Sequence, residues 1–176
     1  MKNIEKTKMV ELPIFDEDII KARSLAKNLG VLKNSITKGQ HSIYGFLGEI
    51  LVSRYLDMPL NNTYEYDIKN IGGLTLEVKT KRCTSSPKEN YDCSIANFNT
   101  KQKCTYYVFV RVLADMSKGW LLGYKSKEDY FKNSIFMKRG TVDPSNNFTV
   151  RADCHNMKIS KLSDIKNLKI MLDKEV

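Results

Sequence analysis

The chain has 176 residues, of which 41% are hydrophobic and 10% aromatic, and it carries a formal net charge of +9 at pH 7. These values favour one folded domain with a sizeable core and exclude a disordered tail. No apolar run is long enough to span a bilayer, and the N-terminal segment lacks the apolar stretch of a signal peptide. The four cysteines are scattered without a C-x-x-C pair, so we expect a cytoplasmic protein with reduced thiols, no zinc site and no membrane partner.

Basic residues recur along the whole chain rather than in one tail. A polyanion is the natural partner for such a charge distribution, and nucleic acid is the commonest polyanion. The alternative is a basic protein that is merely soluble, and charge by itself does not separate the two.

The first 56 residues favour two helices. Residues 15–30 begin with an acidic first turn and end at Gly30, which suits a C-terminal cap. A polar connection leads to a second helix over residues 41–56. Its apolar residues follow helical spacing: Ile43, Phe46, Leu47, Ile50, Leu51 and Tyr55.

The hydrophobic period then changes from helix to strand. We predict strands over 63–69 and 74–80 around a Gly-Gly turn, a loop at 83–90, a short strand at 91–96 and a short helix or turn at 97–103. Residues 104–113 are apolar enough for the centre of a sheet. A strand at 119–124, a helix capped by Ser126, edge strands at 148–152 and 157–160, and a helix at 163–172 complete the chain.

This order of elements predicts the α/β class with a mixed sheet. We expect a single domain over residues 1–176, since no repeat or low-complexity linker interrupts it. Its core would span about 41–125, with an N-terminal helical extension at 1–40 and a C-terminal accessory region at 126–176.

The triplet Glu77-Val78-Lys79 is weak as a motif, because the chain holds three acid-x-Lys triplets and chance supplies about as many. The turn around Gly72 adds geometry. It sets Asp67 opposite Glu77 in an antiparallel pair, with Cβ atoms roughly 5 Å apart on one face. Two carboxylates at that separation repel each other unless a cation lies between them.

Lys79 falls on the same face as Glu77, two residues further along the strand. Two hard oxygen ligands beside an ammonium group suit Mg²⁺ and a phosphate ester. The alternative is an exposed strand surface on which Lys69, Lys79 and Lys81 neutralise the carboxylates as cross-strand pairs.

Glu49 adds a third carboxylate on the preceding helix. It follows Gly45 and Gly48 and shares a helical stripe with Val52 and Leu56. At this edge of the buried face a carboxylate without a partner is costly. The glycines would let the helix pack close to the sheet; the alternative is a solvated glutamate beside tolerated glycines.

In order and spacing, the stretches YGFLGE, YEYDIKN and LTLEVKTK resemble the PD-(D/E)xK nuclease superfamily, in its restriction-endonuclease-like and junction-resolvase-like types from phages and bacteria. The resemblance covers about residues 43–113. It implies an α-β-β-β-α-β core, here with an N-terminal helix and C-terminal accessory strands and helices. Tyr66 stands where the family has a proline, and GWLLGYKSKEDYF looks similar to accessory units of family members.

The resemblance also implies roles. Asp67 and Glu77 would hold Mg²⁺ or Mn²⁺ with the carbonyl of Val78, Glu49 would be an outer or additional ligand, and Lys79 would orient water or stabilise charge. The expected activity is hydrolysis of DNA phosphodiester bonds, as an endonuclease and possible homodimer. The residues expected to contact DNA are Lys81, Arg82, Lys101, Gln102 and Lys103.

Three further alternatives stay open. Gln102 and Tyr106 match the Gln-x-x-x-Tyr pattern of one exonuclease branch, where the pattern lies on a helix, whereas Tyr106 is predicted here to start a strand. The whole chain could also be a non-catalytic nuclease-like module that binds DNA or a protein. RNA stays open as a substrate.

Overall fold

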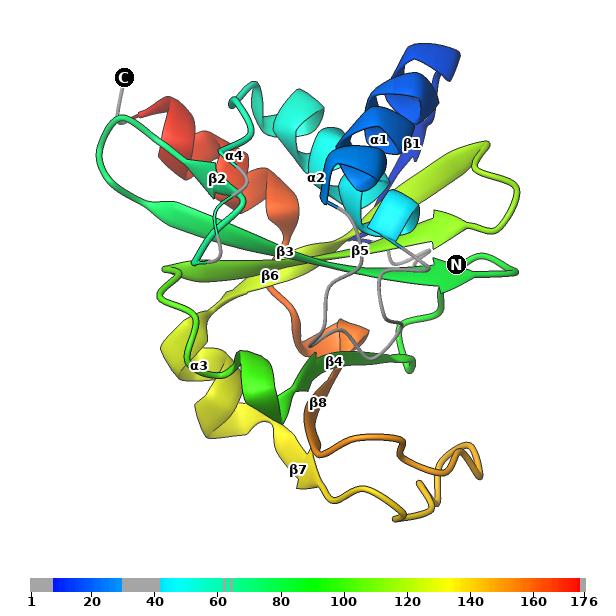
Figure 1. The fold of residues 1–176 in the computed structure, drawn as a ribbon. Coiled ribbons are helices and arrows are strands. Elements are labelled where there is room, and N and C mark those ends of the chain that lie inside the picture. The colour runs from blue at the N-terminus through cyan, green and yellow to red at the C-terminus, as the bar shows by residue number, and fades with distance from the viewer. Residues whose placement is uncertain (1–7, 30–41, 62, 64, 175–176) are drawn as a thin grey trace, which may run out of the picture.

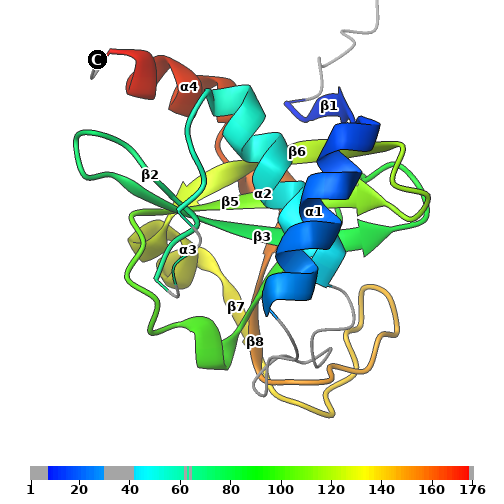
Figure 2. The same cartoon turned by 45° about the horizontal axis from the view of Figure 1, so that its top comes forward.

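A computed structural model describes residues 8–29, 42–61, 63 and 65–174. The fold is mixed α/β, as the sequence predicts. The described residues contain a five-stranded sheet, a smaller three-stranded sheet and four α-helices (Figures 1 and 2). None of the described helices combines the length and the apolar character needed to cross a membrane.

The five-stranded sheet has the order β1-β6-β5-β3-β2. Its strands are β1 (Val10–Pro13), β6 (Lys118–Ser126), β5 (Tyr106–Leu113), β3 (Thr75–Cys83) and β2 (Ile68–Lys69). β3 and β5 run parallel, and the other neighbours run antiparallel. β5 lies at the centre, which confirms its prediction as a central strand, because its side chains are apolar on both faces.

Three helices cover one face of this sheet: α1 (Asp16–Leu29), α2 (Ser42–Leu56) and α4 (Ile165–Asp173) (Figure 1). The α2 residues Phe46, Leu47, Ile50 and Leu51 form the main core with β3, β5 and β6. The predicted apolar stripe of this helix is thereby confirmed. The predicted helix start at His41 and the Gly30 cap of the first helix lie outside the described residues.

The second sheet lies against the other face (Figure 1). It has the order β4-β8-β7, formed by β4 (Asp92–Ala96), β8 (Cys154–Lys158) and β7 (Ile135–Met137). The helix α3 (Lys127–Asn133) begins at Ser126, whose hydroxyl accepts a hydrogen bond from Asp129 N and confirms the predicted cap. Tyr130 of α3 donates to backbone oxygens of both β4 and β8, which ties the helix to this sheet.

The strand predicted over 63–69 is shorter in the structure and covers Ile68–Lys69. The preceding residues form a turn instead of a ladder: the hydroxyl of Thr63 bonds the backbone of Tyr66, and Asn61 N donates to Asp67 O. Polar side chains compete here with strand pairing for the backbone groups. The register of the hairpin is nevertheless as predicted, with Ile68 opposite Leu76.

The segment predicted as a third strand of the core, β4, joins the second sheet. Both edges of β3 are occupied, one by β2 and one by β5, so no position beside β3 is free for it. The predicted helix or turn at 97–103 is a single 3₁₀ turn, η1 (Asn97–Asn99).

The C-terminal strands also differ from the prediction. Residues 148–152 contribute an isolated bridge from Thr149 to Val142 rather than an edge strand. The strand expected at 157–160 begins earlier, as β8, and residues 159–161 form the 3₁₀ turn η2 (Ile159–Lys161). β1 and β7 were not predicted, because four and three residues are too few for a clear alternating pattern.

Candidate active site

The side chains of β3 alternate between two environments. Leu76 and Val78 point into the core shared with α2. Glu77 and Lys79 point to the opposite face, where their register partners on β5 are Tyr107 and Phe109. The strand thus anchors itself on one side and presents an acid and a base on the other.

Asp67 lies directly before β2, at the edge of β3. Its Oδ2 atom accepts a hydrogen bond from the backbone N–H of Val78 at 2.7 Å. That N–H is available because β2 begins only at Ile68, so the β2–β3 ladder does not reach Val78. The side chain is 8% exposed, so this carboxyl is held close to Glu77 in a nearly dry environment.

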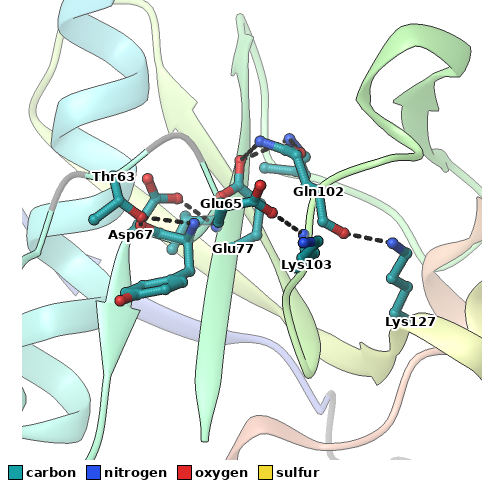
Figure 3. Close-up of polar contacts among 10 residues, drawn as sticks. Thr63, Glu65, Asp67, Glu77, Gln102, Lys103 and Lys127 are labelled. Carbon is teal, nitrogen blue, oxygen red and sulfur yellow. Dashed lines mark hydrogen bonds and ion pairs between the residues drawn. The ribbon is translucent and has the colours of Figure 1, made fainter. Parts of the chain in front are cut away.

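Glu77, Lys79 and Gln102 form a closed ring of hydrogen bonds. Lys79 Nζ donates to Glu77 Oε1 at 2.8 Å and to Gln102 Oε1 at 2.9 Å. Gln102 Nε2 donates to Glu77 Oε1 at 2.9 Å. Figure 3 shows Gln102 reaching Glu77 from the segment that connects η1 to β5. The amide therefore fixes the acid and the base relative to each other.

Glu49 approaches from α2 on the helical side of the sheet. The close packing predicted for this helix is confirmed at Gly48, where an added Cβ would lie 1.9 Å from Thr80 Oγ1. The same prediction is wrong for Gly45, because an added Cβ there would meet nothing within 4 Å. The close approach at Gly48 brings the neighbouring Glu49 carboxyl into electrostatic contact with Asp67, Glu77 and Lys79.

The carboxyl groups carry oxygen atoms that the protein leaves unpaired. Within the described part of the chain, Glu49 Oε2 and Glu77 Oε2 are buried and lack a hydrogen-bond partner. A buried carboxylate oxygen without a donor or cation is costly. The arrangement therefore favours protonation or binding of a cation.

The pKa values of two carboxyls reflect this crowding. Burial, followed by the charges of Asp67 and Glu77, raises the pKa of Glu49 from 4.5 to about 9. Burial and the charge of Glu77 raise the pKa of Asp67 from 3.8 to about 7, against the Val78 N–H and Lys79, which lower it. Strongly raised carboxyl pKa values in one cluster are typical of functional sites.

The donor set suits a hard divalent cation, since Asp67, Glu77, Glu49 and the Val78 carbonyl all offer oxygen. Among the residues that the structure describes, however, no three or more His, Cys, Asp and Glu side chains are placed to hold a metal ion together. Lys79 and Gln102 engage Glu77, and the Val78 N–H engages Asp67. A metal ion would therefore compete with these hydrogen bonds.

The residues predicted to contact DNA are not equivalent in the structure. Lys81 is exposed on the same face of β3 as Lys79, and exposed Lys101 and Lys103 flank the buried Gln102. Arg82 points to the other face, where its guanidinium lies 5.8 Å from the ring centre of Tyr44. Four of the five therefore lie beside the carboxyl cluster or on its face, and Arg82 does not.

The segment between η1 and β5 makes contacts with two residues that the sequence did not predict, Glu65 and Lys127. Lys127 Nζ donates to the backbone oxygen of Gln102, and Lys103 N donates to Glu65 Oε2 (Figure 3). These contacts join positions far apart in the sequence, and no local pattern indicates them. Tyr106 starts β5 as expected, but it packs against Tyr124 on the helical face, so it does not accompany Gln102.

The chain matches neither a protein-family model nor a curated protein sequence.

Proposed function

We propose that the protein is a Mg²⁺- or Mn²⁺-dependent deoxyribonuclease, an endonuclease of the PD-(D/E)xK type. The observation that carries this proposal is the cluster of half-buried Glu49 with buried Asp67 and Glu77 beside Lys79. Two of its oxygen atoms lack partners among the described residues. Such a cluster is unfavourable for stability alone, and the net charge of +9 suits a nucleic-acid substrate.

In the proposed reaction a water molecule releases one proton and its oxygen bonds to phosphorus, the opposite P–O ester bond breaks, and the leaving alcohol oxygen takes up one proton, so that the proton count is unchanged. A bound divalent ion would lower the pKa of that water and polarise the phosphate. Lys79 contributes positive charge near the reacting phosphate, and Gln102 holds the Lys79 ammonium in place. The Val78 N–H orients Asp67, and burial of the acids keeps bulk water away.

The specific α-β-β-β-α-β core is part of the proposal. It is supported by the order α2, β2, β3, β5, with Asp67 directly before β2, Glu77 on the adjacent β3, and β3 parallel to β5. β4 lies in the other sheet, and a single 3₁₀ turn stands where the core would have its second helix.

A second candidate is a non-catalytic nuclease-like module that binds DNA or a protein. The ion pair between Glu77 and Lys79 favours it, because an internal cation already balances one carboxylate. Divalent-ion titration separates the two functions. A binding module shows no metal affinity that depends on Asp67 and Glu77.

The direct test is incubation of plasmid, linear duplex, single-stranded and four-way-junction DNA with Mg²⁺ or Mn²⁺. Wild-type protein is expected to cut at least one form. Glu77→Ala and Lys79→Ala should lower the rate by about 100-fold or more, since each removes a group that acts in the transition state. Equal cleavage by all three proteins would contradict the assignment of the site, and no metal-dependent cleavage of any form would contradict the proposed function.

A further inference from the structure

Two positive charges lie side by side beyond the carboxyl cluster. Lys81 of β3 and Arg111 of β5 are register partners in the parallel ladder, so their side chains share one face. Lys79, two residues before Lys81, points to the same face. Lys81 is exposed to solvent, whereas Arg111 is 7% exposed and lies deeper.

Among the described residues, neither of these two cations takes part in a salt bridge. In the described residues, the salt bridges involve other lysines and arginines. Arg111 Nη2 donates to the backbone oxygen of Asp92 at 3.1 Å, and its guanidinium lies 5.2 Å from the ring centre of Tyr91. The nearby Asp92 carboxylate forms its ion pair with Lys158 at 2.9 Å. Lys81, Arg111 and Lys158 thus surround the single carboxylate of Asp92.

This arrangement is unfavourable for folding by itself. Like charges in neighbouring positions of a ladder repel each other, and a buried guanidinium loses its hydration. Partial desolvation, followed by the Arg111 charge, lowers the pKa of Lys81 below its ordinary value, which agrees with that repulsion. A bound anion would remove the repulsion.

We propose that Lys81, with Arg111 behind it, forms a subsite for a phosphate next to the one that is hydrolysed at Lys79. Two residues along a strand span about 6.6 Å, which is comparable to the spacing of consecutive phosphates in a nucleic-acid strand. This inference rests on the proposed function. It names the substrate class as a polynucleotide strand with a charged phosphate beside the scissile one, rather than an isolated phosphodiester.

The test measures the hydrolysis of two substrates by wild-type protein and by Lys81→Gln. One is an oligothymidylate, which has neighbouring phosphates, and the other is bis(p-nitrophenyl) phosphate, which has none. The kcat/KM for the oligothymidylate divided by the kcat/KM for bis(p-nitrophenyl) phosphate should fall about tenfold in Lys81→Gln, mainly through a higher KM for the oligonucleotide. The slope of log affinity against log salt should fall by about one.

Lys21→Gln is the matched control, because Lys21 is exposed on α1 and its removal changes the net charge equally. In Lys21→Gln the kcat/KM values for both substrates and the salt slope should equal those of wild type. Arg111→Gln should reproduce the effect of Lys81→Gln if its thermal unfolding shows that it folds. If Arg111→Gln does not fold, Lys81→Gln alone tests the subsite.

A ratio in Lys81→Gln that equals that of wild type would overturn the subsite, even if Glu77→Ala abolishes cleavage as proposed. If wild-type protein hydrolyses neither substrate, the cleavage test on the four DNA forms decides the proposed function separately. Oligonucleotide affinity then tests the subsite: a loss of about tenfold in Lys81→Gln supports it, and equal affinity of the two proteins contradicts it.

Discussion

The Glu49 carboxyl couples the proton balance of the site to the stability of the protein. In the unfolded chain this group releases its proton near pH 4.5, but burial and the neighbouring acids keep it protonated in the folded protein to about pH 9. The folded state therefore binds more protons than the unfolded state across this window. Stability must fall as pH rises through it.

Glu49→Gln tests this coupling, because the amide is neutral in both states. Without divalent ions, the free energy of unfolding of wild type should fall between about pH 4.5 and pH 9 more steeply than that of Glu49→Gln. Asp67, whose pKa is raised to about 7, adds to the fall up to that pH in both proteins. Urea unfolding over a pH series measures the difference. Parallel pH profiles would show that Glu49 does not carry a raised pKa.

In the proposed reaction Gln102 is a positioning residue, since it contacts Glu77 and Lys79 rather than the reacting atoms. Gln102→Ala should reduce kcat about 10- to 100-fold with little change in KM, because the Lys79 ammonium loses its orientation. It should also reduce stability by about 1–3 kcal/mol, because buried polar groups lose their partner. Wild-type kcat in a destabilised Gln102→Ala would assign Gln102 a purely structural role.

At this scale the sequence predicts the four residues of the proposed site and the pairing of Asp67 with Glu77. It predicts Gln102 as a contact to DNA in the wall of the site and as part of a Gln-x-x-x-Tyr pattern, but not its contacts to the acid and the base. Its hydrogen bonds to Glu77 and Lys79 bridge 25 and 23 positions, and a local pattern carries no information on such contacts.

The packing of α2 against β3 decides how near Glu49 comes to the acids of the sheet. Gly48 allows this approach, because any Cβ there would collide with the Thr80 side chain. Gly45 lies on the same helix without such a neighbour and offers a matched control.

Gly48→Ala should destabilise the protein by about 1–3 kcal/mol through overpacking, and it should weaken metal-dependent cleavage by moving Glu49. Gly45→Ala should leave cleavage as in wild type and stabilise the helix by up to about 1 kcal/mol. Chemical denaturation of both variants measures the two effects. Similar stability of the two alanine variants would contradict the close packing at Gly48.

The predictability of the elements follows the strength of their patterns. β5 and α2 carry long apolar patterns and were predicted correctly. The strand before Asp67 was predicted too long, since side-chain hydrogen bonds of Asn61 and Thr63 replace strand pairing there. A strand prediction based on alternating polar and apolar residues does not include this competition between side chains and the neighbouring strand for backbone hydrogen bonds.

In the whole molecule, helices cover one face of the main sheet, and the second sheet with α3 covers the other (Figure 2). The sequence predicts the class and the central strand but not the division into two sheets. Strand propensity indicates an extended chain at β4 and at the end of β8, whereas the partners of these strands depend on which edges of the main sheet remain free.

The central claim is that the acids of the site bind a divalent cation, and metal-dependent stabilisation tests it without relying on a chosen substrate. At pH 7.5, Mg²⁺ or Mn²⁺ at 100 times its dissociation constant should stabilise wild-type protein by about 2.7 kcal/mol. The same ion should not stabilise a folded Asp67→Asn or Glu77→Ala variant. Equal stabilisation of wild type and both variants, or none in wild type, would contradict the account.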